Sequence, residues 1–259
     1  MSKALNKQRY SKFAEGYVRS ITHAKGADLD MLVTIAEPQA DWHVLDIATG
    51  GGHTALKFAP LVKSVIASDL TPTMLDVAEK FIREQDINNV AFKVADAEDL
   101  PFADEQFDLV TCRIAPHHFP DIAQFVRESA RVLKTGGLLL VQDHVLPENS
   151  DVATIVDKFE KVRDPSHHHA LSASAWIETF TEAGLTVKNT RELTKRHQFI
   201  DWAKRQGNDE ATIAQLVEMV ASASDAIKEW MQVEKWGTAE ASFVNHHIIV
   251  AGYKSDSKK

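Results

Sequence analysis

The sequence has little cysteine and no long apolar stretch. Cys112 is the single cysteine among 259 residues, which excludes a disulfide framework and a zinc site built on several thiolates. No apolar run approaches the ~18 residues that a membrane-spanning helix requires, and the N-terminus has neither the apolar core nor the cleavage site of a secretory signal. We therefore expect a cytoplasmic protein without a membrane span.

The sequence also lacks a cluster of basic residues. It contains 29 Lys and Arg against 37 Asp and Glu, which gives a formal charge of −8. Because binding to a nucleic-acid backbone requires clustered cations, we expect no nucleic-acid partner. With 44% hydrophobic and 25% charged residues, the composition is that of an ordinary globular protein, and a small molecule is the expected partner.

Apolar blocks of strand length alternate with helical patterns through the first 145 residues. After Pro72, for example, Met74, Val77, Ala78 and Phe81 recur at the spacing of an amphipathic helix. The alternation predicts a parallel sheet with helices on both faces. The expected strands are 43–47, 65–69, 90–95, 107–113 and 138–142.

The alternation of strands and helices changes after residue 145. The pattern indicates two insertions, at 147–170 and 197–236, the second mostly helical. A helix is expected at 173–183, and strands at 185–193 and 243–253 are expected to complete the sheet.

The two ends of the chain are expected to lie outside the sheet. Residues 1–40 predict two short helices, the first carrying Tyr10, Phe13 and Tyr17, and 255–259 are expected to be a disordered tail.

A triple-glycine turn follows the first expected strand. Glycines suit a turn in which the backbone bends sharply and a ligand approaches closely. The spacing of Gly50, Gly52 and Ala55 matches the dinucleotide pattern G-x-G-x-x-A. Asp46, however, stands just before the turn, where it would repel a pyrophosphate and favour a cationic or zwitterionic ligand. This motif alone leaves both kinds of ligand open.

The turn resembles the first motif, D-x-G-x-G-x-G, of the class I S-adenosylmethionine-dependent methyltransferases. Asp46, Gly50 and Gly52 match, and Ala48 replaces the first glycine. Further motifs follow in the family's order at 67–70, 94–102, 107–113 and 131–137. Within the family, the sequence is most similar to the ubiquinone/menaquinone C-methyltransferase-like, type 11 group.

The resemblance implies a Rossmann-like fold over 41–254, with a mostly parallel seven-stranded sheet and an antiparallel last strand. It also implies S-adenosylmethionine as cofactor and a small-molecule methyl acceptor. Asp69, at the end of the second strand, would accept from the ribose hydroxyls, and Asp96, after the third, from the adenine amino group. The implied cofactor-binding residues are Asp46, Ala48, Gly50, Gly51, Gly52, Thr54, Asp69, Leu70, Met74, Asp96, Ala97 and Arg113.

Two histidines follow the fourth strand, in the loop that faces the transferring methyl in this family. A neutral imidazole near pH 7 suits a general base, so His117 and His118 are the catalytic candidates, with His144 a further one. The alternative is that these rings only pack. No metal is expected at 167–169, because adjacent histidines rarely converge on one ion and no familiar ligand spacing lies nearby.

Several residues of the insertions are expected to cover the acceptor. They are 163–167, Trp202, Trp230 and Trp236, with Tyr10, Phe13, Tyr17 and His23 closing the other side; the alternative is that the tryptophans pack the insertion's own core. Two other functions stay open: an NAD(P)-dependent oxidoreductase, and a non-catalytic nucleoside-binding protein. The sequence indicates neither the acceptor nor an oligomeric state.

Overall fold

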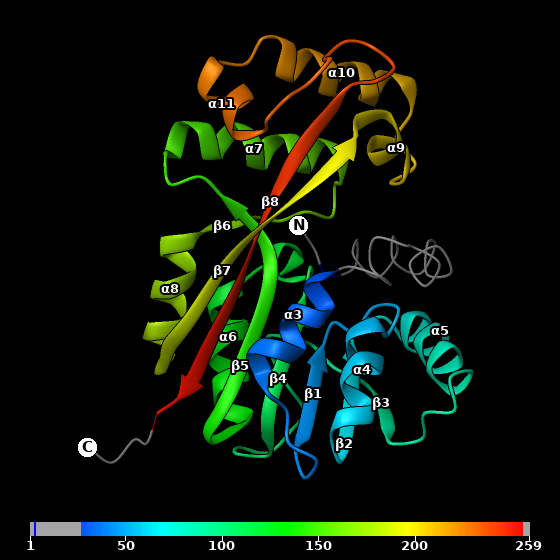
Figure 1. The fold of residues 1–259 in the computed structure, drawn as a ribbon, viewed down its shortest axis with the longest axis vertical. Coiled ribbons are helices and arrows are strands. Elements are labelled where there is room, and N and C mark those ends of the chain that lie inside the picture. Colours follow the sequence, from blue (N-terminus) through cyan, green and yellow to red (C-terminus); the bar gives the residue numbers. More distant parts are fainter. Residues whose placement is uncertain (1–2, 4–26, 256–259) are drawn as a thin grey trace.

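The structure is a computed structural model that describes Lys3 and residues 27–255 (Figure 1). Its main sheet has the strand order β3-β2-β1-β4-β5-β8-β7. Neighbours among β1 to β5 pair in parallel, and β8 is antiparallel to both β5 and β7, which confirms the expected fold class. The strands are β1 His43–Ile47, β2 Ser64–Asp69, β3 Val90–Val94, β4 Phe107–Arg113, β5 Leu133–Leu146, β7 Leu185–Gln198 and β8 Ser242–Lys254, and the short β6 Leu171–Ser172 pairs with β5.

Alternate residues of each strand face opposite layers of helices. Leu45 and Val110 belong to a core with helices α6 and α8, whereas Val44 and Leu109 belong to a core with α3, α4 and α5. Both faces of the sheet are therefore covered, as expected for parallel strands. These helices are α3 Ala27–Ala36, α4 His53–Phe58, α5 Pro72–Arg83, α6 Ile122–Val132 and α8 Ala173–Glu182.

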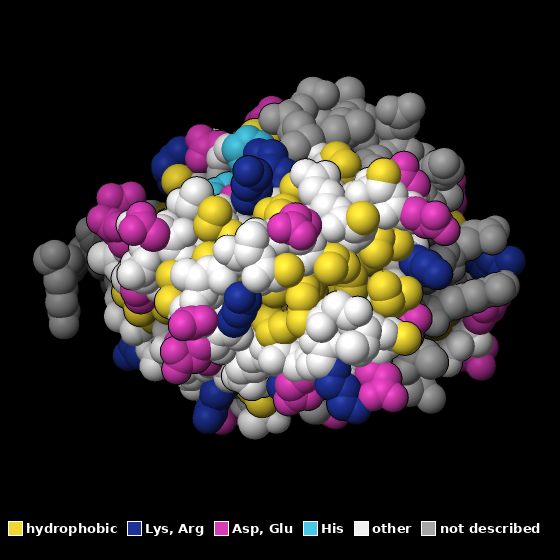
Figure 2. Space-filling view, turned by 90° about the horizontal axis from the view of Figure 1, so that it is seen from above, with side chains coloured by type: hydrophobic (Ala, Val, Ile, Leu, Met, Phe, Trp, Pro, Cys, Tyr) yellow, Lys and Arg dark blue, Asp and Glu magenta, His cyan; other side chains and the backbone are white. Residues whose placement is uncertain are grey.

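A cap with its own core stands above the carboxyl ends of the strands (Figure 1). Its members are α7 Ser150–Arg163, α9 Phe199–Lys204, α10 Glu210–Ala221 and α11 Asp225–Trp230. Phe159, Phe199 and Leu216 are among the buried residues that hold these helices together. On the outer face, hydrophobic side chains gather at the centre with charged ones around them (Figure 2).

Strands β7 and β8 connect the cap to the sheet. Their pairing runs from Leu185 opposite Lys254 to Gln198 opposite Ser242, so β7 continues five residues beyond the expected end at Leu193. Strand β5 is likewise longer than predicted at both ends. Most side chains of β7 are exposed, so the sequence has no apolar pattern that would predict its full length.

The ends of the chain are described in part. The second expected N-terminal helix is α3, which packs its buried Leu29 and Leu32 against the sheet. The first, with Tyr10, Phe13 and Tyr17, lies outside the described residues, as do His23 and 256–259 of the expected tail. In the described part of the chain, no helix has the length and apolarity to cross a membrane.

Candidate active site

The turn between β1 and α4 depends on left-handed backbone conformations. Gly52 ends it with a φ of +82°, and a Cβ there would lie 2.9 Å from Cδ1 of Ile82, so only glycine fits. Ala48 has a φ of +51°, in place of the family's usual glycine, at a cost of about 1–2 kcal/mol. The turn is thus packed tightly against α5 at Gly52, whereas a Cβ at Gly50 would make only ordinary contacts, the nearest at 3.7 Å to Cε of Met74.

Asp46 lies beneath this turn, fully buried. Its Oδ2 accepts from Oγ1 of Thr49 at 2.6 Å, and its Oδ1 accepts from Oγ1 of Thr111 at 2.7 Å. Burial raises the pKa of this carboxyl to about 6, although the two hydroxyls lower it in part. Asp46 therefore ties the glycine turn to β4 and places negative charge under the site.

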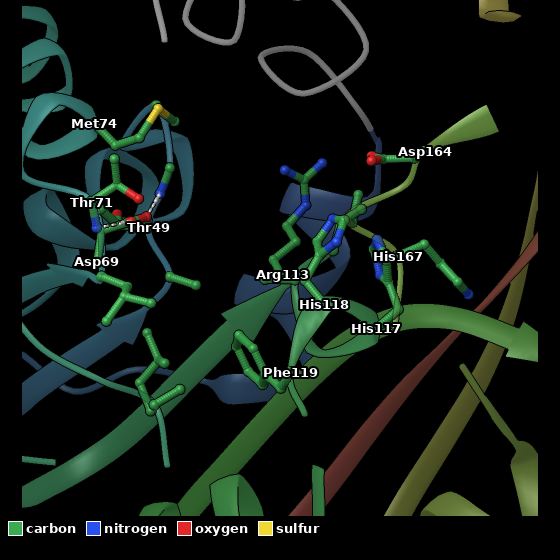
Figure 3. A pocket seen from close by; sticks show the side chains of 18 of the residues that line it. Thr49, Asp69, Thr71, Met74, Arg113, His117, His118, Phe119, Asp164 and His167 are labelled. Atoms are coloured by element: carbon green, nitrogen blue, oxygen red, sulfur yellow. Dashed lines mark hydrogen bonds between the residues drawn. The ribbon is translucent and has the colours of Figure 1, made fainter. Parts of the chain in front are cut away.

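Asp69 ends β2 and joins two backbone segments. Its Oδ2 accepts from the backbone N–H of Gly50 at 3.1 Å, and its Oδ1 accepts from that of Thr71 at 2.8 Å (Figure 3). Burial raises the pKa of this carboxyl, and both N–H donors oppose the shift. The carboxylate lines a cavity beside the glycine turn.

Asp96, the third predicted acid, follows β3 and contacts the N-terminal Lys3. The Nζ of Lys3 lies 2.6 Å from Oδ2 of Asp96 and 2.5 Å from Oε2 of Glu98. The other oxygen of Asp96 accepts from the backbone N–H of Glu98. A ligand amino group at Asp96 would therefore replace Lys3.

A cavity of about 860 Å³ connects these acids to the cap. It is lined by every predicted cofactor-binding residue except Gly52, whose place is against α5, and by both His117 and His118. Figure 3 shows Asp69 and Met74 on one side and His117, His118 and His167 on the other. A volume near the upper end of the usual range for small-molecule sites suits two ligands side by side.

Arg113 enters the cavity from the end of β4 and is held by α3. Its Nη2 lies 2.7 Å from Oδ2 of Asp28, and both side chains are buried. Asp28 also accepts from Lys195 and from the amide of Gln142. Burial alone would raise the pKa of Asp28, but Arg113 and Lys195 hold it well below its ordinary value. This cluster fixes α3 against the strand ends.

His117 forms a buried dyad with Asp143. Its Nδ1 lies 2.6 Å from Oδ1 of Asp143, and its backbone N–H donates to Oδ2 at 2.7 Å. Burial lowers the pKa of His117 well below its usual range and raises that of Asp143 to about 7. Among the described residues, Nε2 of His117 has no hydrogen-bond partner, so this nitrogen is available to a ligand in the cavity.

Further histidines surround His117. The ring of His144 stacks on that of His117 with centroids 4.5 Å apart, and His247 packs edge-on against His144. His118 instead places Nδ1 3.0 Å from the backbone oxygen of Ser166. Nowhere within Lys3 and 27–255 do three or more His, Cys, Asp or Glu side chains form a group that could hold a metal.

The far end of the cavity is built by the cap. Of the segment expected to cover the acceptor, Arg163, Asp164 and His167 line it. Trp202 lines it too and stacks on Phe159. Trp230 and Trp236 instead pack against the cap's core, as in the alternative interpretation.

Sequence reasoning missed several residues at this end, because helical or strand pattern alone does not reveal which side chains face the cavity. They are Glu160, Lys195, His197, Asn245 and His247, together with Asp143 beneath His117.

The glycine turn after β1, the acids at the tips of β2 and β3, and this strand order define a class I S-adenosylmethionine-dependent methyltransferase. The chain belongs to this family. It matches the model of the family described as a methyltransferase domain (Methyltransf_11) over residues 45–141. It is 39% identical over 250 residues to the uncharacterized methyltransferase YcgJ of Bacillus subtilis, covering 96% of this chain and 99% of the relative.

Other comparisons agree. The crystal structure of YcgJ superposes with a TM-score of 0.86 at 36% identity and covers 89% of this chain and 99% of that one. The ubiquinone/menaquinone biosynthesis C-methyltransferase UbiE of a Marinomonas species is 38% identical over 120 residues, about half of each chain (45% and 48%). The literal dinucleotide pattern at Gly50 therefore does not indicate an oxidoreductase.

Proposed function

We propose that this protein transfers a methyl group from S-adenosylmethionine to a small-molecule acceptor bound beneath the cap. The observation that carries the proposal is the continuous cavity, which places the glycine turn and Asp69 at one end and the unoccupied ring nitrogen of His117 toward the other. One end suits a nucleoside, and at the other end His117 can accept a proton from a bound ligand.

The chemistry of the donor set fits S-adenosylmethionine and disfavours a dinucleotide. Asp46, Asp69 and Asp96 all line the cavity near the glycine turn. Carboxylates accept hydrogen bonds from hydroxyl and amino groups and attract a sulfonium or ammonium, but they repel phosphates. Asp69 would bind the ribose, Asp96 the adenine amino group, and Ala97, Leu70 and Met74 the apolar faces of the nucleoside.

When bound, S-adenosylmethionine supplies a methyl group on a sulfonium, whose sulfur keeps the electron pair of the broken carbon–sulfur bond. His117 accepts at Nε2 the proton that the acceptor loses as its lone pair bonds to the methyl carbon. Asp143 holds the opposite nitrogen, which fixes the ring and its tautomer. The cap excludes water and aligns the acceptor, which contributes most of the acceleration.

Calorimetry with S-adenosylmethionine tests the cofactor site. Replacing Asp69 by alanine removes a charge-assisted acceptor, so we expect the Kd to rise roughly tenfold to hundredfold. Asp76, exposed on α5 and outside the cavity, supplies the matched control, Asp76→Ala, whose Kd should equal that of the wild type. Equal affinity in Asp69→Ala and wild type would contradict the ribose role of Asp69.

A further inference from the structure

Arg163, the last residue of α7, is a cavity-lining arginine that forms no ion pair within the described residues, although its charge lowers the pKa of the neighbouring Glu160 and Asp164. Its Cζ lies 4.3 Å from the centroid of the Trp202 ring, and its Nη2 donates to the backbone oxygen of Trp202 at 3.3 Å. Its Nε is buried and has no hydrogen-bond partner. No carboxylate among the described residues lies within 4 Å of the guanidinium nitrogens. The side chain is thus held in place by stacking and keeps N–H donors unused.

The acids nearest to Arg163 are engaged with other groups. Oε1 of Glu160 accepts from the amide of Asn245 at 2.8 Å, and burial raises the pKa of Glu160 although the charge of Arg163 opposes the shift. Oδ1 of Asp164 accepts from both the backbone N–H and the hydroxyl of Ser166. Neither acid forms an ion pair with the guanidinium of Arg163.

Cationic side chains reach the cavity where α9 and β7 meet it, in a lining that also includes the acids Glu160 and Asp164. Lys195, Arg205 and His197 line this end together with Arg163, and Lys195 is bound to Asp28. Burial, and then Arg205, Arg163 and Lys195, lower the pKa of His197 to about 4, so its ring stays neutral and adds no charge of its own. An oxyanion at the guanidinium of Arg163 would accept from its unused N–H groups and pair with its charge.

We infer that the methyl acceptor carries an oxyanion group, a carboxylate or a phosphate, that binds Arg163 while the methyl-accepting atom lies at His117. The inference rests on the proposed function, since it concerns the acceptor of that reaction. A buried guanidinium N–H without an acceptor is costly, and the planar fork of Arg163 matches an oxyanion in a bidentate geometry. Stacking on Trp202 presets the orientation of that fork, which reduces the entropy lost on binding.

The experiment measures binding of simple anions to protein saturated with S-adenosylhomocysteine. The probes are benzoate and phenyl phosphate, one for each oxyanion, with neutral benzamide as their uncharged counterpart, all at constant ionic strength in a calorimeter. We expect at least one anion to bind the wild type and benzamide to bind much more weakly. Whichever anion binds more tightly distinguishes a carboxylate acceptor from a phosphate one.

Variants locate the anion. Arg163→Met should weaken anion binding roughly tenfold or more, and Arg163→Lys, which keeps the charge but not the fork, should have an intermediate effect. The matched control is Arg191→Met, at an exposed position of β7 outside the cavity, which should bind as the wild type does. Circular dichroism and the Kd for S-adenosylhomocysteine show whether each variant keeps its fold.

The inference is overturned if neither anion binds the wild type, if benzamide binds as tightly as benzoate, or if Arg163→Met binds the anions unchanged. The comparison of benzoate with benzamide uses only the wild type, so it decides even if Arg163→Met does not fold. Failure of the wild type to bind S-adenosylhomocysteine would instead contradict the proposed function. In that case the anions are titrated without that ligand, so that the anion site is tested separately from the cofactor site.

Discussion

The Nδ1 atom of His117 lies 2.6 Å from Oδ1 of Asp143; both side chains are buried, and His117 lines the cavity. With the pKa of His117 lowered and that of Asp143 raised to about 7, the imidazole is neutral at pH 7 and the carboxyl of Asp143 is about half ionised. Replacing His117 by glutamine should reduce methyl transfer roughly 10²- to 10⁴-fold and leave the Kd for S-adenosylmethionine unchanged. The measurement is transfer of tritiated methyl to a deproteinised small-molecule extract.

His169→Gln is the matched control, because this histidine is exposed and outside the cavity. It should retain wild-type transfer. If His117→Gln also retained it, His117 would have a packing role only.

Asp143 acts through His117, so its variant should change a pH profile as well as a rate. Protonation of Asp143 removes the negative charge that supports a proton on the imidazole, so transfer should fall as the pH is lowered through about 7. Asp143→Asn should be slow and should lose this pH dependence. Nitrogen NMR of the imidazole gives a second readout: the wild type should carry its proton on Nδ1, and Asp143→Asn should favour Nε2, as an amide donor to Nδ1 requires. An unchanged tautomer and profile would contradict the role of Asp143.

Asp46 should lower stability while it supports cofactor binding. Its pKa is about 6 when folded and near 3.8 when unfolded, so its own contribution to stability is highest below pH 3.8 and falls as the pH rises through 6. The shift corresponds to about 3 kcal/mol at pH 7. Asp46→Asn should therefore unfold at higher urea concentration than the wild type at pH 7.5, with little gain at pH 4, yet bind S-adenosylmethionine more weakly. A stability gain that does not depend on pH would contradict this account.

Asp28 should have the opposite effect on stability. Arg113 and Lys195 lower its pKa, so its contribution is present above the unfolded value of 3.8 and is lost as the pH falls through its folded value. Asp28→Asn leaves Arg113 buried without its counter-ion, which should cost about 3–5 kcal/mol in urea unfolding at pH 7. Asp30→Asn, on the same helix but exposed, should cost less than about 1 kcal/mol. Equal losses of stability in the two variants would contradict the claim that Asp28 stabilises the fold by pairing with the buried Arg113.

The sequence predicts best those features that depend on neighbours along the chain. Strands β1 and β4 have the predicted bounds, because each is a buried run that a polar turn ends. Asp69 and Asp96 follow successive predicted strands, and both line the cavity, because parallel strands bring their carboxyl ends to one edge of the sheet. Local pattern and strand direction suffice for this half of the site.

The other half depends on pairing between distant strands. Arg113 pairs with Gln142, so the residues that follow β4 lie beside β5, and His117 meets Asp143. His144 faces His247 because β5 and β8 pair in that register. No local pattern encodes these registers, and the exposed side chains of β7 conceal its length. The dyad and the cap's contribution to the cavity therefore required the structure.

Lys3 should compete with the cofactor for Asp96. Its Nζ contacts both Asp96 and Glu98 through partly exposed ion pairs, which are worth up to about 1 kcal/mol. If the adenine amino group binds Asp96, it must displace Lys3, so Lys3→Met should bind S-adenosylmethionine up to about fivefold more tightly in calorimetry.

Lys63→Met, at an exposed position outside the cavity, controls for the lost charge and should leave the Kd unchanged. Salt should reduce the difference, because these pairs are accessible to ions. Weaker binding by Lys3→Met would mean that Lys3 contacts the cofactor instead of competing with it, and an unchanged Kd would place the adenine away from Asp96.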